Sequence, residues 1–209
     1  MRMTTLTDDL LSQLSGAPMQ QMAQRLGLAP QQMAGAAAAA LPLLMGALGK
    51  QASQPQGAEA LLGALGRDHA GGGGIGDLLG AVLGGGGGRQ ADGAGILGHI
   101  FGARESQAAQ GLGQATGIGG DKAQMLLKIL APIVMAYLAK RMFGGGQAQA
   151  AAPSAGALDE VLGRETRAVR QQGGIGGGLL GAVLDQDGDG QFGLSDVLKM
   201  GGSILGGKR

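Results

Sequence analysis

An internal duplication of a long apolar segment constrains the fold of this chain more than any other feature. The segment LGLAPQQMAGAAAAALPLLMGALGK ends at Lys50, and TGIGGDKAQMLLKILAPIVMAYLAK ends at Lys140, at an offset of 90 residues without a gap. At this offset glycines and prolines coincide: Gly27 aligns with Gly117, and Pro42 with Pro132. The repeat predicts two related helical units that cover each other's apolar surface.

A shorter repeat extends each copy. Residues 73–83, GGIGDLLGAVL, match residues 173–184, GGIGGGLLGAVL, with one extra glycine in the later copy. Each copy is therefore a helical unit followed by a glycine-rich LLGAVL unit. The chain divides into two related halves, roughly 1–95 and 96–209.

Hydrophobic patterning predicts an all-α, multihelical fold. In Thr5–Leu14 the leucines recur at the spacing of one helix face, and no stretch alternates apolar and polar residues as a strand does. With 46 glycines and only 2% aromatic residues, the core must consist of Leu, Ile, Val, Met and Ala. Helices are expected near residues 5–14, 18–26, 30–48, 57–66, 76–83, 95–102, 105–116, 121–142, 157–171, 176–184 and 194–205.

Glycine-rich stretches predict the domain organisation. The stretches with linker composition are Gly71–Gly74, Gly84–Gly95 and Gly144–Ala155. The expected organisation is a helical domain over 1–142 containing units at 1–50 and 96–142, a flexible linker over 143–155, and a C-terminal helical segment over 156–209 with a loop at 185–196.

The stretch LDQDGDGQFGLSD, residues 184–196, has the spacing of an EF-hand calcium loop. Such a loop places oxygen ligands at positions 1, 3, 5, 7, 9 and 12, and a glycine at position 6. Counting from Asp185 puts Gly190 at position 6. The expected ligands are Asp185, Asp187, Asp189, the backbone carbonyl of Gln191, and Asp196. The expected cofactor is Ca²⁺, with Mg²⁺ as a substitute.

A metal-free turn remains the alternative for this loop. Position 12 is Asp196 rather than glutamate, and position 9 is Gly193, which has no side-chain oxygen. Asp-Gly pairs also form ordinary turns. In the first half, glycines occupy the equivalent positions, so the turn itself does not require carboxylates. These glycines are Gly84, Gly86 and Gly88.

Signals for other functions are weaker. The net charge of +1 is not that of a chain with a concentrated basic face for nucleic acid. Residues 19–39 have the rhythm of a helix-turn-helix, but the second helix offers only Gln31 and Gln32 for reading bases. DNA association is kept as the alternative function. His69 and His99 have no serine or carboxylate at a recognisable catalytic spacing. The sequence therefore favours a non-enzymatic interaction or structural module.

The N-terminus does not resemble a signal peptide, because Asp8 and Asp9 interrupt it and no apolar core segment follows. The uncharged run Met33–Gly49 is rich in alanine and short for a membrane span. There is no cysteine, which is consistent with a reducing compartment. We expect a cytoplasmic protein whose partner is another protein or a second copy of itself, rather than nucleic acid or a membrane.

Several segments together resemble one bacterial family. They are DDLLSQL, LAPIVMAYLAK, GGGGIGDLLGAVLGGGGG, ADGAGILGHIFG and LLGAVLDQDGDGQFGLSDVLKMGGSILGG. The family is domain of unknown function 937, which is similar to the helical YidB-like proteins, and the resemblance covers nearly the whole chain. It implies an all-helical bacterial protein with no assigned reaction and no catalytic residues to transfer.

Overall fold

The computed structural model describes residues 5–69, 80–81, 84, 92–143 and 154–172. Within these residues the fold is all-helical and has no strand, which confirms the predicted fold class. The helices are α1 (Leu6–Leu14), α2 (Ala17–Leu26), α3 (Pro30–Ala52), α4 (Pro55–Ala64), the π-helical turn η1 (Leu65–His69), α6 (Gly93–Phe101), the 3-10 turn η3 (Gly102–Arg104), α7 (Glu105–Thr116), α8 (Gly120–Phe143) and α9 (Ala155–Gln172).

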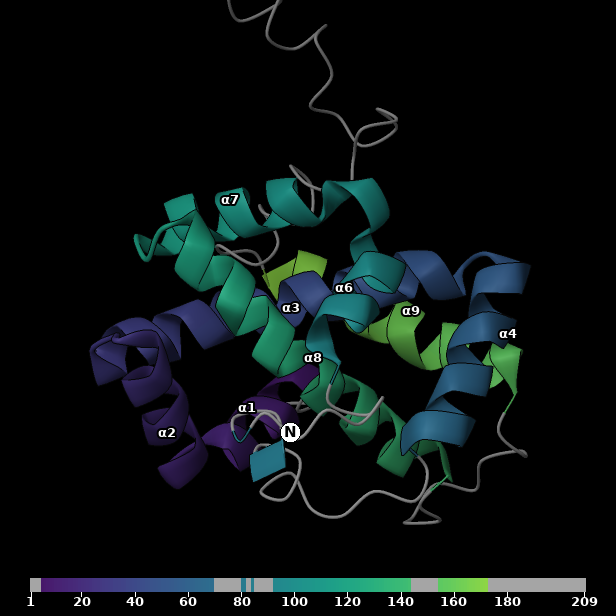
Figure 1. Ribbon diagram of the computed structural model, residues 1–209. Coiled ribbons are helices and arrows are strands. Elements are labelled where there is room, and N and C mark those ends of the chain that lie inside the picture. Colours follow the sequence, from purple (N-terminus) through teal and green to yellow (C-terminus); the bar gives the residue numbers. More distant parts are fainter. Residues whose placement is uncertain (1–4, 70–79, 82–83, 85–91, 144–153, 173–209) are drawn as a thin grey trace, which may run out of the picture.

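The core is formed around two long helices, α3 and α8, which contact each other at the centre of the molecule (Figure 1). Every residue from Leu41 to Gly49 and from Ile129 to Ala139 is buried. These stretches are almost entirely Leu, Met, Ala, Ile and Val, so the core contains the residue types that the composition predicts. Pro42 and Pro132 lie inside these helices and are buried.

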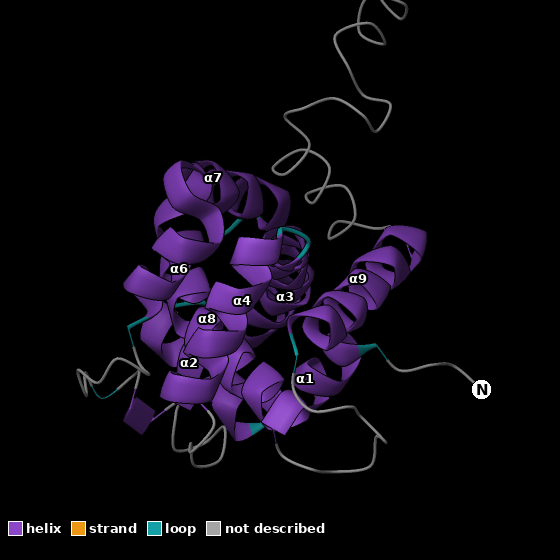
Figure 2. Ribbon diagram, turned by 90° about the vertical axis from the view of Figure 1, so that its right-hand side faces the viewer, coloured by secondary structure: helices purple, strands orange, loops and turns teal. Residues whose placement is uncertain are grey.

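The shorter helices surround this pair. Helices α1 and α2 contact α3, and α2 also contacts α8. Helices α6 and α7 contact α8 chiefly and α3 to a smaller extent. Figure 2 shows α6 and α7 on one side of α3 and α9 on the other. Helix α9 packs along α3 and also contacts α4. Helix α3 continues to Ala52, past the predicted end near residue 48, and Leu48, Gly49 and Ala52 are all buried.

Local chemistry explains several helix ends. The Asp8 N–H donates to Thr5 Oγ1 at 3.1 Å, and the Thr5 N–H donates to Asp8 Oδ2 at 3.3 Å, which together cap α1. Gly27 and Gly117 end α2 and α7 in left-handed conformations, with φ of 58° and 71°. These are the two glycines that coincide in the sequence repeat.

The predicted linker Gly84–Gly95 is wrong at its C-terminal end, because α6 already begins at Gly93. The Asp92 side chain caps this helix by accepting the Gly95 N–H at 2.9 Å. A Cβ at Gly93 would overlap the backbone carbonyl of Lys128 in α8, so glycine is needed for α6 to approach α8 here. Similarly, Ala155 is the first residue of α9 rather than the end of a linker.

Some predicted elements lie outside the described residues. They are the helices at 176–184 and 194–205, most of the helix at 76–83, the linker Gly71–Gly74, and most of the other two linkers.

Helices α3 and α8 are also long and apolar enough to cross a membrane, by length and composition alone. The apolar window of each is mostly inside the protein, with 78% of the α3 window and 72% of the α8 window buried. Core helices of soluble proteins have the same properties, so this is weak evidence for a membrane span.

Candidate functional site

The predicted metal ligands lie outside the described residues. This applies to Asp185, Asp187, Asp189, Gln191 and Asp196. Within the part of the chain that the structure describes, no group of three or more His, Cys, Asp or Glu residues could hold a metal ion. The metal site therefore remains a prediction from sequence.

A buried carboxylate joins α9 to the start of α1. Glu165 of α9 is only 4% exposed. Its Oε2 accepts the Leu6 N–H at 2.8 Å, and its Oε1 accepts the Thr7 N–H at 2.8 Å and the Thr7 hydroxyl at 2.5 Å. The first N–H groups of a helix have no partner inside the helix and carry partial positive charge. Glu165 therefore provides from a distant helix the anionic acceptor that the start of α1 requires.

A second polar contact lies close to the first. The hydroxyl of Tyr137, in the C-terminal half of α8, donates to Asp9 Oδ2 at 2.6 Å. Burial, followed by the hydrogen bond and the negative charge of Asp9, raises the pKa of the Tyr137 hydroxyl well above its usual range, while Arg141 acts in the opposite direction. The negative charge of Glu165 adds a smaller effect that also raises this pKa.

This α1–α8–α9 junction, formed by Thr7, Asp9, Tyr137 and Glu165, holds helices together by hydrogen bonds. Each of these side chains has a hydrogen-bond partner inside the protein. Hydrogen bonds of this kind between buried side chains stabilise one packing arrangement of the helices. The hydrogen bonds of the junction therefore fix the position of α1 relative to α8 and α9.

Sequence reasoning missed the junction, although two signals were present. Glu165 follows Leu158 and Leu162 at the spacing of one helix face, so a charged residue occupies a position where an apolar one is expected. Both leucines are fully buried. Tyr137 is the chain's one tyrosine and lies in an otherwise apolar stretch, residues 129–139. Neither signal identifies the partner, because the partners lie far away in the sequence.

Of the two histidines, only the side chain of His99 is described by the structure, and the hydrogen bond at this residue involves its backbone carbonyl. His99 is exposed on α6, and its carbonyl accepts a hydrogen bond from Gln51 Nε2 of α3 at 3.2 Å. The side chain of His69 lies outside the described residues.

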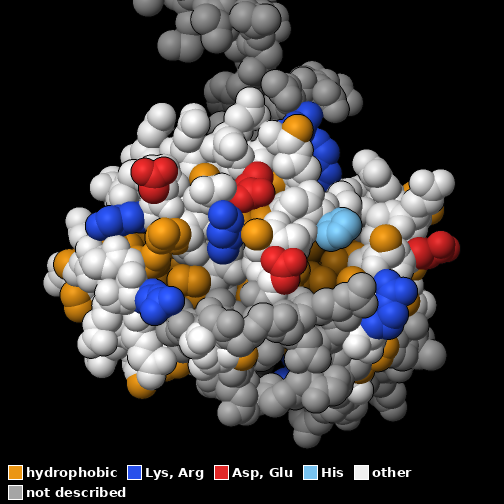
Figure 3. Space-filling view, viewed as in Figure 1, with side chains coloured by type: hydrophobic (Ala, Val, Ile, Leu, Met, Phe, Trp, Pro, Cys, Tyr) orange, Lys and Arg blue, Asp and Glu red, His pale blue; other side chains and the backbone are white. Residues whose placement is uncertain are grey.

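The helix-turn-helix candidate corresponds to α2 and α3. Gln31 and Gln32 are exposed at the start of α3, and Gln32 Oε1 accepts the Ala29 N–H at 3.2 Å. The apolar remainder of α3 lies in the core. On the face shown in Figure 3, the lysine and arginine side chains of the described residues are spread out among uncharged and acidic side chains and form no continuous basic patch.

A family model for bacterial proteins of unknown function, DUF937, matches residues 8–141. The chain belongs to the DUF937 family. The match extends from the first turn of α1 almost to the end of α8, so the DUF937 region contains both central helices, and α9 follows it. Searches of curated proteins and of solved structures found no match.

Proposed function

We propose that this DUF937 protein is a non-catalytic helical interaction module whose C-terminal loop, 185–196, binds a divalent cation weakly. The observation that carries the proposal is the placement of Asp185, Asp187 and Asp189 at alternate positions before Gly190. Four carboxylates within twelve residues repel one another unless a cation lies among them, and Ca²⁺ prefers such oxygen ligands.

The described helices support a non-catalytic role. The buried polar side chains at the α1–α8–α9 junction are engaged in contacts between helices. They are therefore accounted for by packing, without a reaction. The cation loop follows α9, which is held to the body through Glu165. Ordering of the loop would then stabilise a segment that is already anchored at its N-terminal side.

We further infer that the chain consists of two related halves, each built around one long helix, α3 or α8. Helix α3 begins at Pro30 and α8 at Gly120, the same offset as in the sequence repeat. The left-handed glycines at the ends of α2 and α7 have this offset as well. On this proposal the first half keeps glycines at the turn where the second half has acquired carboxylates.

The cation site is tested by calorimetric titration of the full chain with Ca²⁺, compared with Asp187→Ala. We expect binding near 10⁻⁴–10⁻³ M, as for weak sites, and roughly tenfold or greater loss in the variant. Asp159→Ala is a matched control, since Asp159 is an exposed aspartate of α9 outside the loop. Absence of heat and of any rise in melting temperature at millimolar Ca²⁺ in the unaltered chain would show that the loop is a metal-free turn.

A further inference from the structure

Helix α9 packs on helices that are distant from it in the sequence. It follows α8 in the chain, but its principal packing partners are α3 and α4. Its buried carboxylate also binds the N–H groups of Leu6 and Thr7 in α1. The surface that receives α9 therefore belongs to the first half of the chain, whereas α9 itself belongs to the second.

The receiving surface, defined by Leu6 and Thr7 of α1, Gly49 of α3, and the adjoining helix α4, has specific recognition features. A Cβ at Gly49 would lie 2.6 Å from Thr166 Oγ1 and 3.5 Å from the Leu162 carbonyl oxygen. The bare backbone at Gly49 thus lets α9 approach α3 closely. The start of α1 supplies partial positive charge for the Glu165 carboxylate. Shape and charge together select an amphipathic helix that carries a carboxylate.

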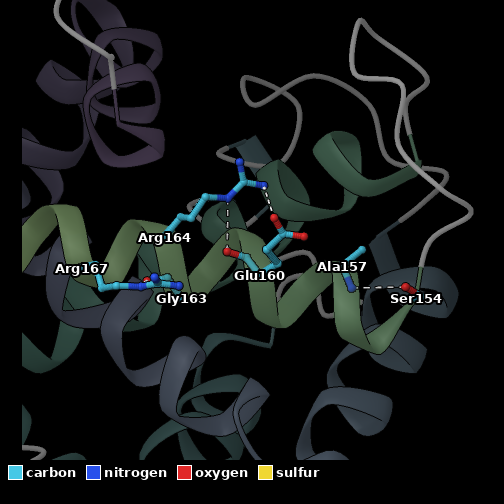
Figure 4. A network of polar contacts seen from close by, with 6 residues as sticks. All are labelled: Ser154, Ala157, Glu160, Gly163, Arg164 and Arg167. Carbon is cyan, nitrogen blue, oxygen red and sulfur yellow. Dashed lines mark hydrogen bonds and ion pairs between the residues drawn. The ribbon is translucent and has the colours of Figure 1, made fainter.

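Several polar groups on the outer face of α9 bond to other residues of α9 or to Ser154, which directly precedes it (Figure 4). Arg164 Nε donates to the Glu160 carbonyl at 3.4 Å and its guanidinium pairs with the Glu160 carboxylate at 3.5 Å. Arg167 Nε donates to the Gly163 carbonyl at 3.1 Å, and Ser154 Oγ accepts the Ala157 N–H at 3.2 Å. These contacts move with α9, so they are retained wherever the helix docks.

We propose that α9 is an exchangeable arm, and that the receiving surface binds α9 of a second copy of this chain. Exchange preserves every contact of the arm and changes only which chain supplies it, which is a low-cost route to a dimer. Three consecutive glycines, Gly144–Gly146, follow α8 in the sequence, and this composition is typical of a linker between two separately packed elements. The proposal names the partner for the interaction role proposed above and does not depend on the cation loop.

Two complementary variants test the exchange. Glu165→Arg places a cation against the start of α1, so this chain keeps a free receiving surface but loses arm docking. Gly49→Leu blocks the receiving surface with a side chain and leaves the arm intact. Each variant alone should have the mass of one chain by light scattering after gel filtration. An equimolar mixture should form a particle of two chains, because the arm of one chain docks on the other.

A mixture that keeps the mass of one chain, while circular dichroism shows both variants helical, would overturn the proposal.

Exchange in the unaltered protein provides a second measurement. A tagged and an untagged copy are incubated together, and the untagged copy should be retained with the tag. When both copies carry Glu160→Arg, on the exposed face of α9, the untagged copy should be retained as well as the unaltered one is. When both copies carry Glu165→Arg, retention should be lost. Failure of retention with the unaltered chain would contradict exchange even if Ca²⁺ binding is observed.

Discussion

At the residue scale, a few polar side chains determine how the apolar helices of this protein are arranged. The core offers little shape specificity, because it consists largely of alanine, leucine and methionine. Glu165 and Tyr137 add directional contacts, which an apolar surface cannot supply. Each connects its own helix to α1, and α1 is thereby positioned by two later parts of the chain.

Removal of the Glu165 carboxylate should destabilise the protein strongly. Glu165→Ala leaves the buried N–H of Thr7 and the partly buried N–H of Leu6 without an acceptor, which lowers the free energy of unfolding by about 1–3 kcal/mol. Glu160→Ala removes a carboxylate from an exposed pair on the same helix and should cost less than about 1 kcal/mol. Urea unfolding of the two variants measures the difference. Equal destabilisation would show that the buried carboxylate has no special role.

The raised pKa of Tyr137 predicts a loss of stability in alkali. An unfolded tyrosine ionises near pH 10, whereas the folded hydroxyl keeps its proton to higher pH. Stability from this residue is therefore complete below about pH 10 and decreases as pH rises from there toward the folded pKa. Urea midpoints between neutral pH and about pH 11 should fall less in Tyr137→Phe than in the unaltered chain.

The composition of the chain makes this ionisation directly measurable. Tyr137 is its one tyrosine and there is no tryptophan, so ultraviolet absorbance of tyrosinate reports this residue alone. An absorbance titration of the native protein with a midpoint at the ordinary tyrosine value would contradict the buried, hydrogen-bonded environment.

At the element scale, glycines permit close packing of helices. Gly93 of α6 faces the Lys128 backbone of α8, and Gly113 of α7 faces the Gly119 backbone, with a Cβ there lying 2.5 Å from the Gly119 carbonyl carbon. Other helical glycines are open, since a Cβ at Gly98 would meet nothing within 4 Å. A high glycine content therefore has different consequences at different positions of the same helix.

Substitution of two glycines in α6 should have opposite effects. Gly93→Ala forces a methyl group into the α8 backbone and should cost about 1–3 kcal/mol by overpacking. Gly98→Ala adds a methyl group in open space and should stabilise the helix by about 0.5–1 kcal/mol. Thermal unfolding of both variants compares them within one helix. Stabilisation by both would show that α6 does not approach α8 closely at Gly93.

At the scale of the whole molecule, the helices before residue 70 and those after residue 92 are interlocked. Helix α9 packs on α3 and α4, while η1 of the first half packs on α8. Lys122 Nζ of α8 also donates to the Gly27 carbonyl at the end of α2, at 3.0 Å. The turn η1 thus covers α8, and α9 covers α3, so each long helix is covered by an element from the other part of the chain.

Cleavage of the chain between the halves should leave one particle. A protease site introduced between Gly84 and Asp92 would separate α1–η1 from α6–α9. The two pieces should elute together in native buffer, because separation exposes the apolar surfaces of α3 and α8 to water. Addition of urea after cleavage should separate them, which verifies that the cut is complete. Separation in native buffer would show that each half is an independent folding unit.

The sequence predicted most of the helices and the family, but not the polar junction or the position of α9. Leucine periodicity, Thr5, Gly27 and Gly117 act through contacts within a few residues, so their patterns can be read along the chain. Glu165 and Thr7 are 158 positions apart, and no local pattern relates them. The start of α6 at Gly93 was missed for a similar reason, because the close approach of α8 that makes glycine necessary there is a tertiary contact. The loop ligands Asp185, Asp187, Asp189, Gln191 and Asp196 lie outside the described residues and stay a prediction.

The sequence by itself determined that this DUF937 chain is all-helical, with two long apolar helices, each preceded by a shorter helix that ends at a glycine. Backbone hydrogen bonds within a helix join residues four apart, and a helix buries one face at a fixed period, so both are local properties. Only the tertiary structure decided that α9 lies on α3, that Glu165 closes the start of α1, and that Tyr137 binds Asp9. Those contacts depend on which apolar helix faces pack against each other. Burial of apolar surface is not directional, and this chain has many apolar faces of similar composition, so the sequence does not specify which pairs form.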